Sequence, residues 1–195
     1  MGKLIMIRHG ESEGNRDRRF TISPEVPLTD LGREQARVAA ARIAHRFTPT
    51  RVISSPFLRA RQTSEIIAGE LGLPIEVVHD LHERDLGALK GESYDLLREM
   101  VKQDPRYDAT QGWLWRPERG ESYEDVRQRV VAAIEGIRAR YPAEELIVVS
   151  HGGVMLSMWA HVMGKWEKAH LPANCEIVLI EHEADRFHPP LIVQD

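Results

Sequence analysis

The fold is decided by the stretch Leu4-Ile5-Met6-Ile7-Arg8-His9-Gly10 and by a second stretch of the same pattern, Leu146-Ile147-Val148-Val149-Ser150-His151-Gly152-Gly153. Each begins with a short apolar run, which predicts a buried strand, and ends in glycine, which predicts a tight turn. In an open parallel sheet, ligands bind at the edge formed by the carboxyl ends of the strands. We therefore expect two imidazoles at one sheet edge, where they can serve as nucleophile, acid or base near neutral pH.

Further strand-like runs alternate with helix-like runs along the chain. Strands are predicted at residues 3–7, 51–54, 75–78, 146–150 and 177–182. Helices are predicted from a cap at Thr29 to about Arg46, from Ser55-Pro56 to a stop at 69–74, from a capping box at Ser122-Asp125 to Pro142, and after Gly153. This alternation predicts an α/β fold, a three-layer α/β/α sandwich around a mostly parallel sheet.

The stretch 91–120 is less regular than the rest. We expect a single domain over residues 1–195, in which this stretch is an irregular or helical, lid-like insertion over the carboxyl edge of the sheet. Its residues Trp113 and Trp115 either pack the insertion or line the substrate mouth. Together with Tyr94, Arg116 and Arg119, they suggest a preference for a small group that is anionic or sugar-like.

Composition narrows the class of protein. The 195 residues suit one domain with a substantial core, and a formal net charge of −4 gives no reason to expect nucleic acid or an anionic membrane as a partner. No apolar run approaches the roughly 20 residues that span a bilayer, and the first residues lack a signal-peptide pattern. Because Cys175 is the single cysteine, no internal disulfide is possible, and we expect a cytoplasmic protein.

Chemistry-bearing residues follow four of the predicted strands. Guanidinium groups can form bidentate hydrogen bonds with phosphate oxygens, and the backbone N–H groups of Gly10 and Gly152 can bind further oxygens. A neutral imidazole can attack phosphorus, and a carboxylic acid can protonate the leaving alkoxide. The first predicted strand is followed by Arg8, His9 and Asn15, the second by Arg59 and Thr63, the third by Glu83 and Arg84, and the fourth by His151 and Gly152. Arg59 and Thr63 share one face of their helix, whereas Arg61 points elsewhere.

These residues stand in four blocks that together resemble the histidine phosphatase superfamily, the phosphoglycerate-mutase-like group. The blocks are Arg8-His9-Gly10-Glu11-Ser12 with Asn15, residues 54–63, residues 83–87 with Gly91, and Ser150-His151-Gly152-Gly153. They occur in the family's order and span essentially the whole chain, which makes the resemblance far more specific than one Arg-His-Gly would be.

The resemblance implies a role for each of these positions. His9 would be the phosphorylated nucleophile and Glu83 the proton donor. Arg8, Arg59 and His151 would form the phosphate pocket, assisted by Asn15 and Gly152. Thr21 would lie in a substrate-binding loop, and Arg84 would touch substrate at the rim.

The superfamily contains both phosphatases and mutases. The residues Arg19-Phe20-Thr21 followed by 26–29 resemble a mutase substrate loop. Mutases, however, tend to have a glycine at the position of Ile22, a lysine at Tyr94 and an arginine pair at Trp115-Arg116. Because a mutase must retain a bisphosphorylated intermediate, the missing cations favour a phosphatase.

We therefore expect a metal-independent phosphatase acting on a small phosphorylated metabolite, with no cofactor. The alternatives are a cofactor-dependent phosphoglycerate mutase and a non-catalytic protein that binds a phospho-ligand. A metal site at His79 and His82 is disfavoured, because no second ligand pair follows at a known spacing. The sequence carries no signal of oligomeric state.

Overall fold

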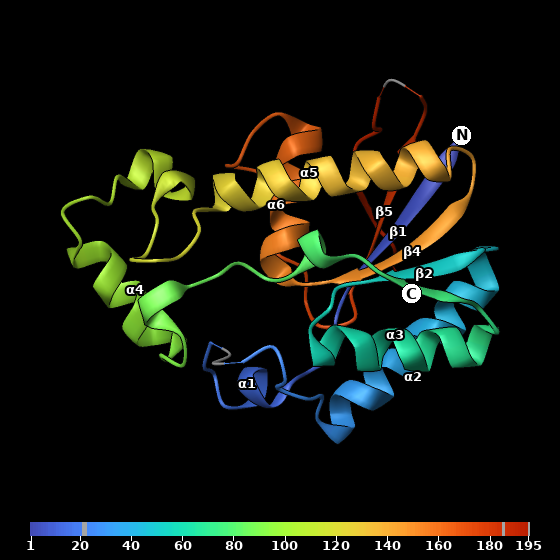
Figure 1. The fold of residues 1–195 in the computed structure, drawn as a ribbon, viewed down its shortest axis with the longest axis horizontal. Helices are drawn as coiled ribbons and strands as arrows, with labels where there is room; N and C mark the ends of the chain where they lie inside the picture. Colours follow the sequence, from blue (N-terminus) through green and yellow to red (C-terminus); the bar gives the residue numbers. More distant parts are fainter. Residues whose placement is uncertain (21–22, 185, 195) are drawn as a thin grey trace.

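The computed structural model describes residues 1–20, 23–184 and 186–194, and it confirms the predicted α/β/α sandwich (Figure 1). Within these residues a six-stranded sheet has the order β3-β2-β4-β1-β5-β6. The strands are β1 (Gly2–Arg8), β2 (Arg51–Ser54), β3 (Ile75–Val77), β4 (Glu145–Ser150), β5 (Ile177–His182) and β6 (Leu191–Ile192). The pairings among β1 to β4 are parallel, and β5 and β6 are antiparallel additions at one side.

Helices cover both faces of the sheet (Figure 1). The helices α5 (Tyr123–Arg140) and α6 (Gly152–Met163) pack on one face, and α2 (Asp30–Arg46) and α3 (Leu58–Leu71) pack on the other. The apolar face of α5 repeats at helical spacing through Val126, Val130, Ile134 and Ile137, all fully buried. The buried apolar surface on both faces fixes the sheet rigidly beneath the candidate site.

The two stretches that end in histidine lie side by side. Strand β1 pairs with β4 in parallel register, with Leu4 opposite Leu146 and Arg8 opposite Ser150. His9 and His151 therefore leave the sheet at the same level of the same edge, as the sequence predicted. Strand β2 ends one step away, with Ser54 opposite Val149.

Most predicted helix boundaries are confirmed, with one clear exception. Thr29 caps α2 by accepting a hydrogen bond from the Gly32 N–H, and Ser122 and Asp125 form the expected capping box of α5. The predicted start at Ser55-Pro56 is wrong, because α3 begins at Leu58. The Ser55 N–H still donates to the Val149 carbonyl of β4, so Ser55 continues the sheet and cannot begin a helix.

Strand β6 was not predicted, since two residues give too short a pattern to recognise. No helix in the described part of the chain combines the length and the apolar character needed to cross a bilayer.

The insertion, residues 91–120, contains α4 (Tyr94–Gln103) and a 3-10 helix, η3 (Ala109–Leu114), and it extends beyond the sheet near α1 (Glu13–Arg16) (Figure 1). Backbone hydrogen bonds join it to the segment after α1, from the Phe20 N–H to the Glu92 carbonyl and from the Tyr94 N–H to the Arg18 carbonyl. Trp115 is 8 % exposed and packs in a small cluster with Leu86 and Leu89, so it packs the insertion and does not line a mouth. These contacts fix the insertion to the segment that follows α1.

Candidate active site

His9 stands at the carboxyl end of β1, buried and in a defined tautomer. Its Nδ1 lies 2.7 Å from the Gly10 carbonyl oxygen, which can only accept, so the proton is on Nδ1. The Nε2 atom therefore carries the lone pair, and the Arg59 Nε–H donates to it at 3.1 Å. The residue is 3 % exposed. This geometry presents Nε2 as a nucleophile.

Burial and neighbouring charges keep this ring neutral. Desolvation, followed by the charges of Arg59 and Arg8, holds the pKa of His9 well below its usual value of 6.5. A neutral ring at physiological pH retains the lone pair that attack on phosphorus requires.

His151 faces His9 across the site. The two ring centroids are 5.1 Å apart and the rings are inclined by 63°. The Ser55 Oγ accepts a hydrogen bond from the Phe57 N–H and lies 2.7 Å from His151 Nε2. When the Ser55 hydroxyl donates to Nε2, the proton of the neutral ring is on Nδ1, a buried atom with no partner among the described residues. Desolvation and the Arg59 charge lower the pKa of His151 well below 6.5, so this ring is neutral, and in this tautomer its Nδ1–H is a donor.

Two guanidinium groups complete the polar surface. Arg59 lies on the first turn of α3 and is 2 % exposed, and its buried Nη1 has no partner in the described chain. Arg8 lies at the end of β1, and its buried Nε also has no partner there. Desolvation lowers the pKa of Arg59 to about 10, which leaves it charged at neutral pH. Buried donors without partners are costly unless an acceptor is bound, so these atoms indicate an anion site.

Glu83 lies on the segment that follows β3. Its Oε1 accepts a hydrogen bond from the Arg84 N–H at 2.8 Å, and its Oε2 accepts one from the Gly153 N–H at 3.3 Å. A Cβ atom at position 153 would lie 2.4 Å from Glu83 Oε1, so only glycine allows this close approach. The carboxyl group is thus held against the start of α6, and Glu83 lines the same cavity as His9.

Asn15 is held by two residues from distant parts of the chain, Tyr94 and Asn174, and by its near neighbour Ser12. Its Nδ2 donates to the Tyr94 hydroxyl at 3.0 Å, and its Oδ1 accepts from Asn174 Nδ2 at 3.2 Å and from Ser12. Asn174 also donates to the His9 carbonyl at 2.9 Å. Asn174 therefore links Asn15 to the backbone of His9.

The structure brings nearly all the predicted site residues to one cavity of about 400 Å³. Lining it are Arg8, His9, Asn15, Arg59, Glu83, Arg84 and Gly152, with Tyr94 from the insertion. His151 does not line this cavity: it is fully buried behind it, against the His9 ring. Arg61 lies outside it and pairs with Glu65 at 3.7 Å. Thr21 lies outside the described residues. The expectation that the Gly10 N–H is free for a ligand is wrong, because it donates to the Thr63 hydroxyl at 3.1 Å.

The model of the histidine phosphatase superfamily (branch 1) matches residues 4–194. The chain belongs to the histidine phosphatase superfamily. The family predicted from the four sequence blocks is thereby confirmed. The predicted class of enzyme, a phosphoric monoester hydrolase of the histidine phosphatase type, is confirmed as well.

Some relatives within the superfamily are named as mutases and others as phosphatases. The chain is 32% identical to phosphoglycerate mutase-like protein 4 of Arabidopsis thaliana, over 90% of this chain and 77% of the relative. It is 31% identical to a metal-independent phosphoserine phosphatase of the same plant, over 82% of this chain and 68% of the relative. A mycobacterial glucosyl-3-phosphoglycerate phosphatase, solved with VO3, superposes with a TM-score of 0.82 at 26% identity, covering 95% and 96% of the two chains.

Two groups of this histidine phosphatase site were missed by the sequence analysis. Ser55 was interpreted as a helix start, although a serine directly before a proline at a strand end is a usable signal for an extended, site-facing residue. Asn174 carried no signal, because it lies in an irregular segment far along the chain. The described residues contain no cluster of three or more His, Cys, Asp or Glu that could bind a metal.

The burial of His9 makes a testable prediction about its titration. In the free protein the ring should titrate with a midpoint below pH 6.5, because desolvation and two guanidinium charges oppose protonation. In the unfolded chain a histidine binds its proton near pH 6.5, so acidification below that value favours unfolding. An NMR pH titration of the histidine ring signals, with His9 assigned from a His9→Gln variant, measures the midpoint. A midpoint at or above 6.5 would contradict this environment.

Proposed function

We propose that this chain hydrolyses small phosphomonoesters without a metal, through a phosphohistidine formed on Nε2 of His9. The observation that carries the proposal is the neutral His9 ring, whose Nε2 carries the lone pair beside Arg59, in a cavity that Arg8 and Arg59 also line. Each of these two arginines has a buried donor without a partner among the described residues, and so has the His151 ring that faces His9. Such an arrangement supplies a nucleophile and a receptor for phosphoryl oxygens at one place.

The first step is the transfer of the phosphoryl group to the protein. The Nε2 lone pair forms a bond to phosphorus while the bond between phosphorus and the ester oxygen breaks. Glu83 donates its proton to the departing oxygen, so the product leaves as an alcohol. Arg8, Arg59 and the Nδ1–H of His151 stabilise the charge on the transferred oxygens. One such oriented donor is typically worth about 10² to 10³ in kcat.

The second step releases phosphate. The Glu83 carboxylate, now deprotonated, takes a proton from water as the water oxygen attacks phosphorus. The bond between phosphorus and Nε2 breaks, the lone pair returns to the ring, and the proton restores the acid form of Glu83. In this proposal Asn15 and the Gly152 N–H bind further phosphoryl oxygens, and Arg84 and Thr21 contact the substrate beyond the phosphate.

A phosphatase is favoured over a mutase by two positions at which mutases tend to have free cationic side chains. Tyr94, where mutases tend to have lysine, lines the cavity and bonds to Asn15. Arg116, at the position of the mutase arginine pair, is engaged with Asp125 at 2.6 Å. The mutase-like name of one relative keeps cofactor-dependent phosphoglycerate mutase as the second candidate. We also propose a cytoplasmic single-domain enzyme whose insertion covers the site.

A panel of phosphomonoesters tests the proposed reaction. We expect release of inorganic phosphate from aryl, alkyl and sugar phosphates, at rates that EDTA does not change. With 3-phosphoglycerate and a bisphosphoglycerate primer, the product should be free phosphate. Formation of 2-phosphoglycerate instead would establish the mutase. Binding of phosphorylated ligands without turnover would establish the non-catalytic alternative.

A further inference from the structure

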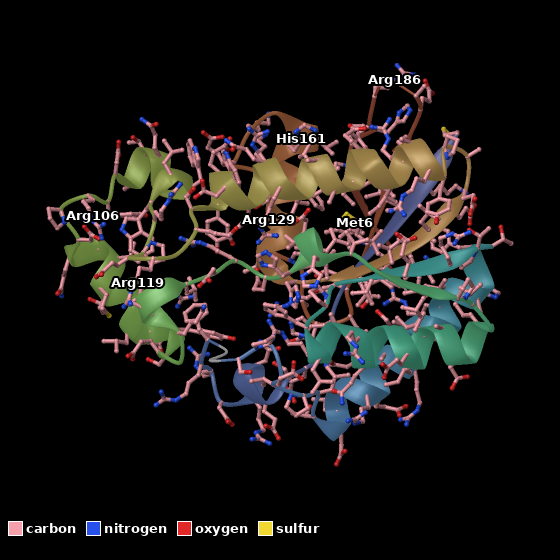
Figure 2. All side chains as sticks on the ribbon, viewed as in Figure 1. Met6, Arg106, Arg119, Arg129, His161 and Arg186 are labelled. Carbon is pink, nitrogen blue, oxygen red and sulfur yellow. The ribbon has the colours of Figure 1, made fainter. Side chains whose placement is uncertain are left out.

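Arg129 on α5 reaches the segment that carries Glu83 but does not line the cavity. Figure 2 shows its side chain extending from α5 toward the chain that follows β3. The side chain is only 15% exposed, although it is charged. Charged side chains are rarely so deeply buried unless each donor has a partner.

The donors of Arg129 hold the backbone on both sides of the acid. Its Nη1 donates to the Asp80 carbonyl at 2.6 Å, within the 3-10 turn η1 (His79–Leu81). Its Nη2 donates to the carbonyl of Glu83 itself at 3.4 Å. The rigid guanidinium fork therefore fixes the distance between these two peptide groups.

The Arg129 guanidinium group also binds Glu121, which in turn binds the backbone of Asp85. The Arg129 Nε and Nη2 donate to the two Glu121 carboxylate oxygens at 2.7 and 2.9 Å. Glu121 Oε2 also accepts from the Asp85 N–H at 2.9 Å, and the Glu121 N–H donates to the Asp85 carbonyl at 2.8 Å. Burial would raise the pKa of Glu121, but the Arg129 and Asp85 hydrogen bonds hold it below its usual value. Glu121 is thus a charged partner at neutral pH.

We propose that Arg129 is a positioning residue for Glu83, and that the Arg129–Glu121 pair sets the place from which the carboxyl group donates its proton. The inference rests on the proposed phosphatase reaction. Arg129 acts only through the backbone of the segment 80–85, because its contacts are to the peptide groups at 80 and 83 and to Glu121.

The choice of leaving group distinguishes positioning of the acid from a general structural role. An alkyl phosphate needs a proton on the departing alkoxide, whereas p-nitrophenolate is stable enough to leave without one. The value of kcat/KM covers only the steps up to departure of the alcohol, so later hydrolysis of the phosphoenzyme does not obscure it. Misplacement of the acid should therefore lower kcat/KM for an alkyl phosphate and spare that for p-nitrophenyl phosphate.

The experiment compares Arg129→Lys with the wild type on both substrates. Lysine keeps the charge but loses the fork, so we expect kcat/KM for the alkyl phosphate to fall by about 10 to 100-fold, and that for p-nitrophenyl phosphate to stay within about twofold. Arg127→Lys is the matched control. Arg127 is also on α5 and pairs with Glu124 at 2.5 Å, without contacting the segment 80–85. In that variant, kcat/KM should stay at the wild-type value for both substrates.

A second variant and a double variant close the test. Glu121→Gln, a neutral residue of the same shape, should reproduce the selective loss, and it serves if Arg129→Lys does not fold by circular dichroism. In a Glu83→Gln background, Arg129→Lys should cause no further loss on the alkyl phosphate, because residues acting as a unit are not additive.

Equal losses on both substrates, no loss on either, or additive losses in the double variant would overturn the positioning role. Failure of the phosphatase proposal is seen separately. In that case the wild type would release no phosphate, or its activity would survive removal of His9.

Discussion

Replacement of His9 by alanine will lower phosphatase activity by on the order of 10⁴-fold or more. The variant lacks the Nε2 lone pair, and His151 cannot replace it, because that ring does not line the cavity and its Nε2 lies 2.7 Å from the Ser55 hydroxyl. Hydrolysis of p-nitrophenyl phosphate gives the steady-state loss. Rapid quenching into base with radiolabelled substrate should trap label on the wild-type protein and none on the variant.

His45→Ala provides the control for that result. His45 is an exposed residue on α2, on the surface of the molecule. The control should retain wild-type turnover and labelling. Turnover near the wild-type rate by the His9 variant would show that phosphoryl transfer does not proceed through this ring.

Glu83→Gln should lower kcat/KM for an alkyl phosphate by about 10² to 10⁴-fold, the usual contribution of a general acid. Glutamine matches the shape but has no proton to give to an alkoxide. The loss should be much smaller with p-nitrophenyl phosphate, since that leaving group departs unprotonated. Plotting kcat/KM against leaving-group pKa should give a steeper dependence for the variant than for the wild type.

The neighbouring carboxyl group is the decisive comparison. Asp85 is engaged with Lys90 at 2.8 Å and with the Gly87 N–H, and it does not line the cavity that His9 and Glu83 share. Asp85→Asn should therefore keep the wild-type dependence on leaving group. If Asp85→Asn lowered kcat/KM selectively for the alkyl phosphate and Glu83→Gln did not, Asp85 would be the general acid instead of Glu83.

The alternation of apolar runs and glycine-terminated strand ends determined most of the architecture. Runs such as Leu146–Val149 can be stable only between two helical layers, and the helical spacing of Val126, Val130, Ile134 and Ile137 specifies one of those layers. Strand ends of a parallel sheet share one edge, so the meeting of His9 and His151 also followed from local pattern. Family resemblance added the identity of the acid block, which periodicity alone does not mark.

Other features depend on contacts between residues far apart in the chain, so they could be seen only in the folded molecule. The tautomer of His151 depends on Ser55, 96 residues away, and the position of Asn15 depends on Asn174. Arg129 looks in sequence like one more charge on the surface of a helix, yet the folded chain buries it against the acid segment. Local sequence encodes which face of an element is apolar, but hydrogen bonds form only when distant partners are brought within about 3 Å.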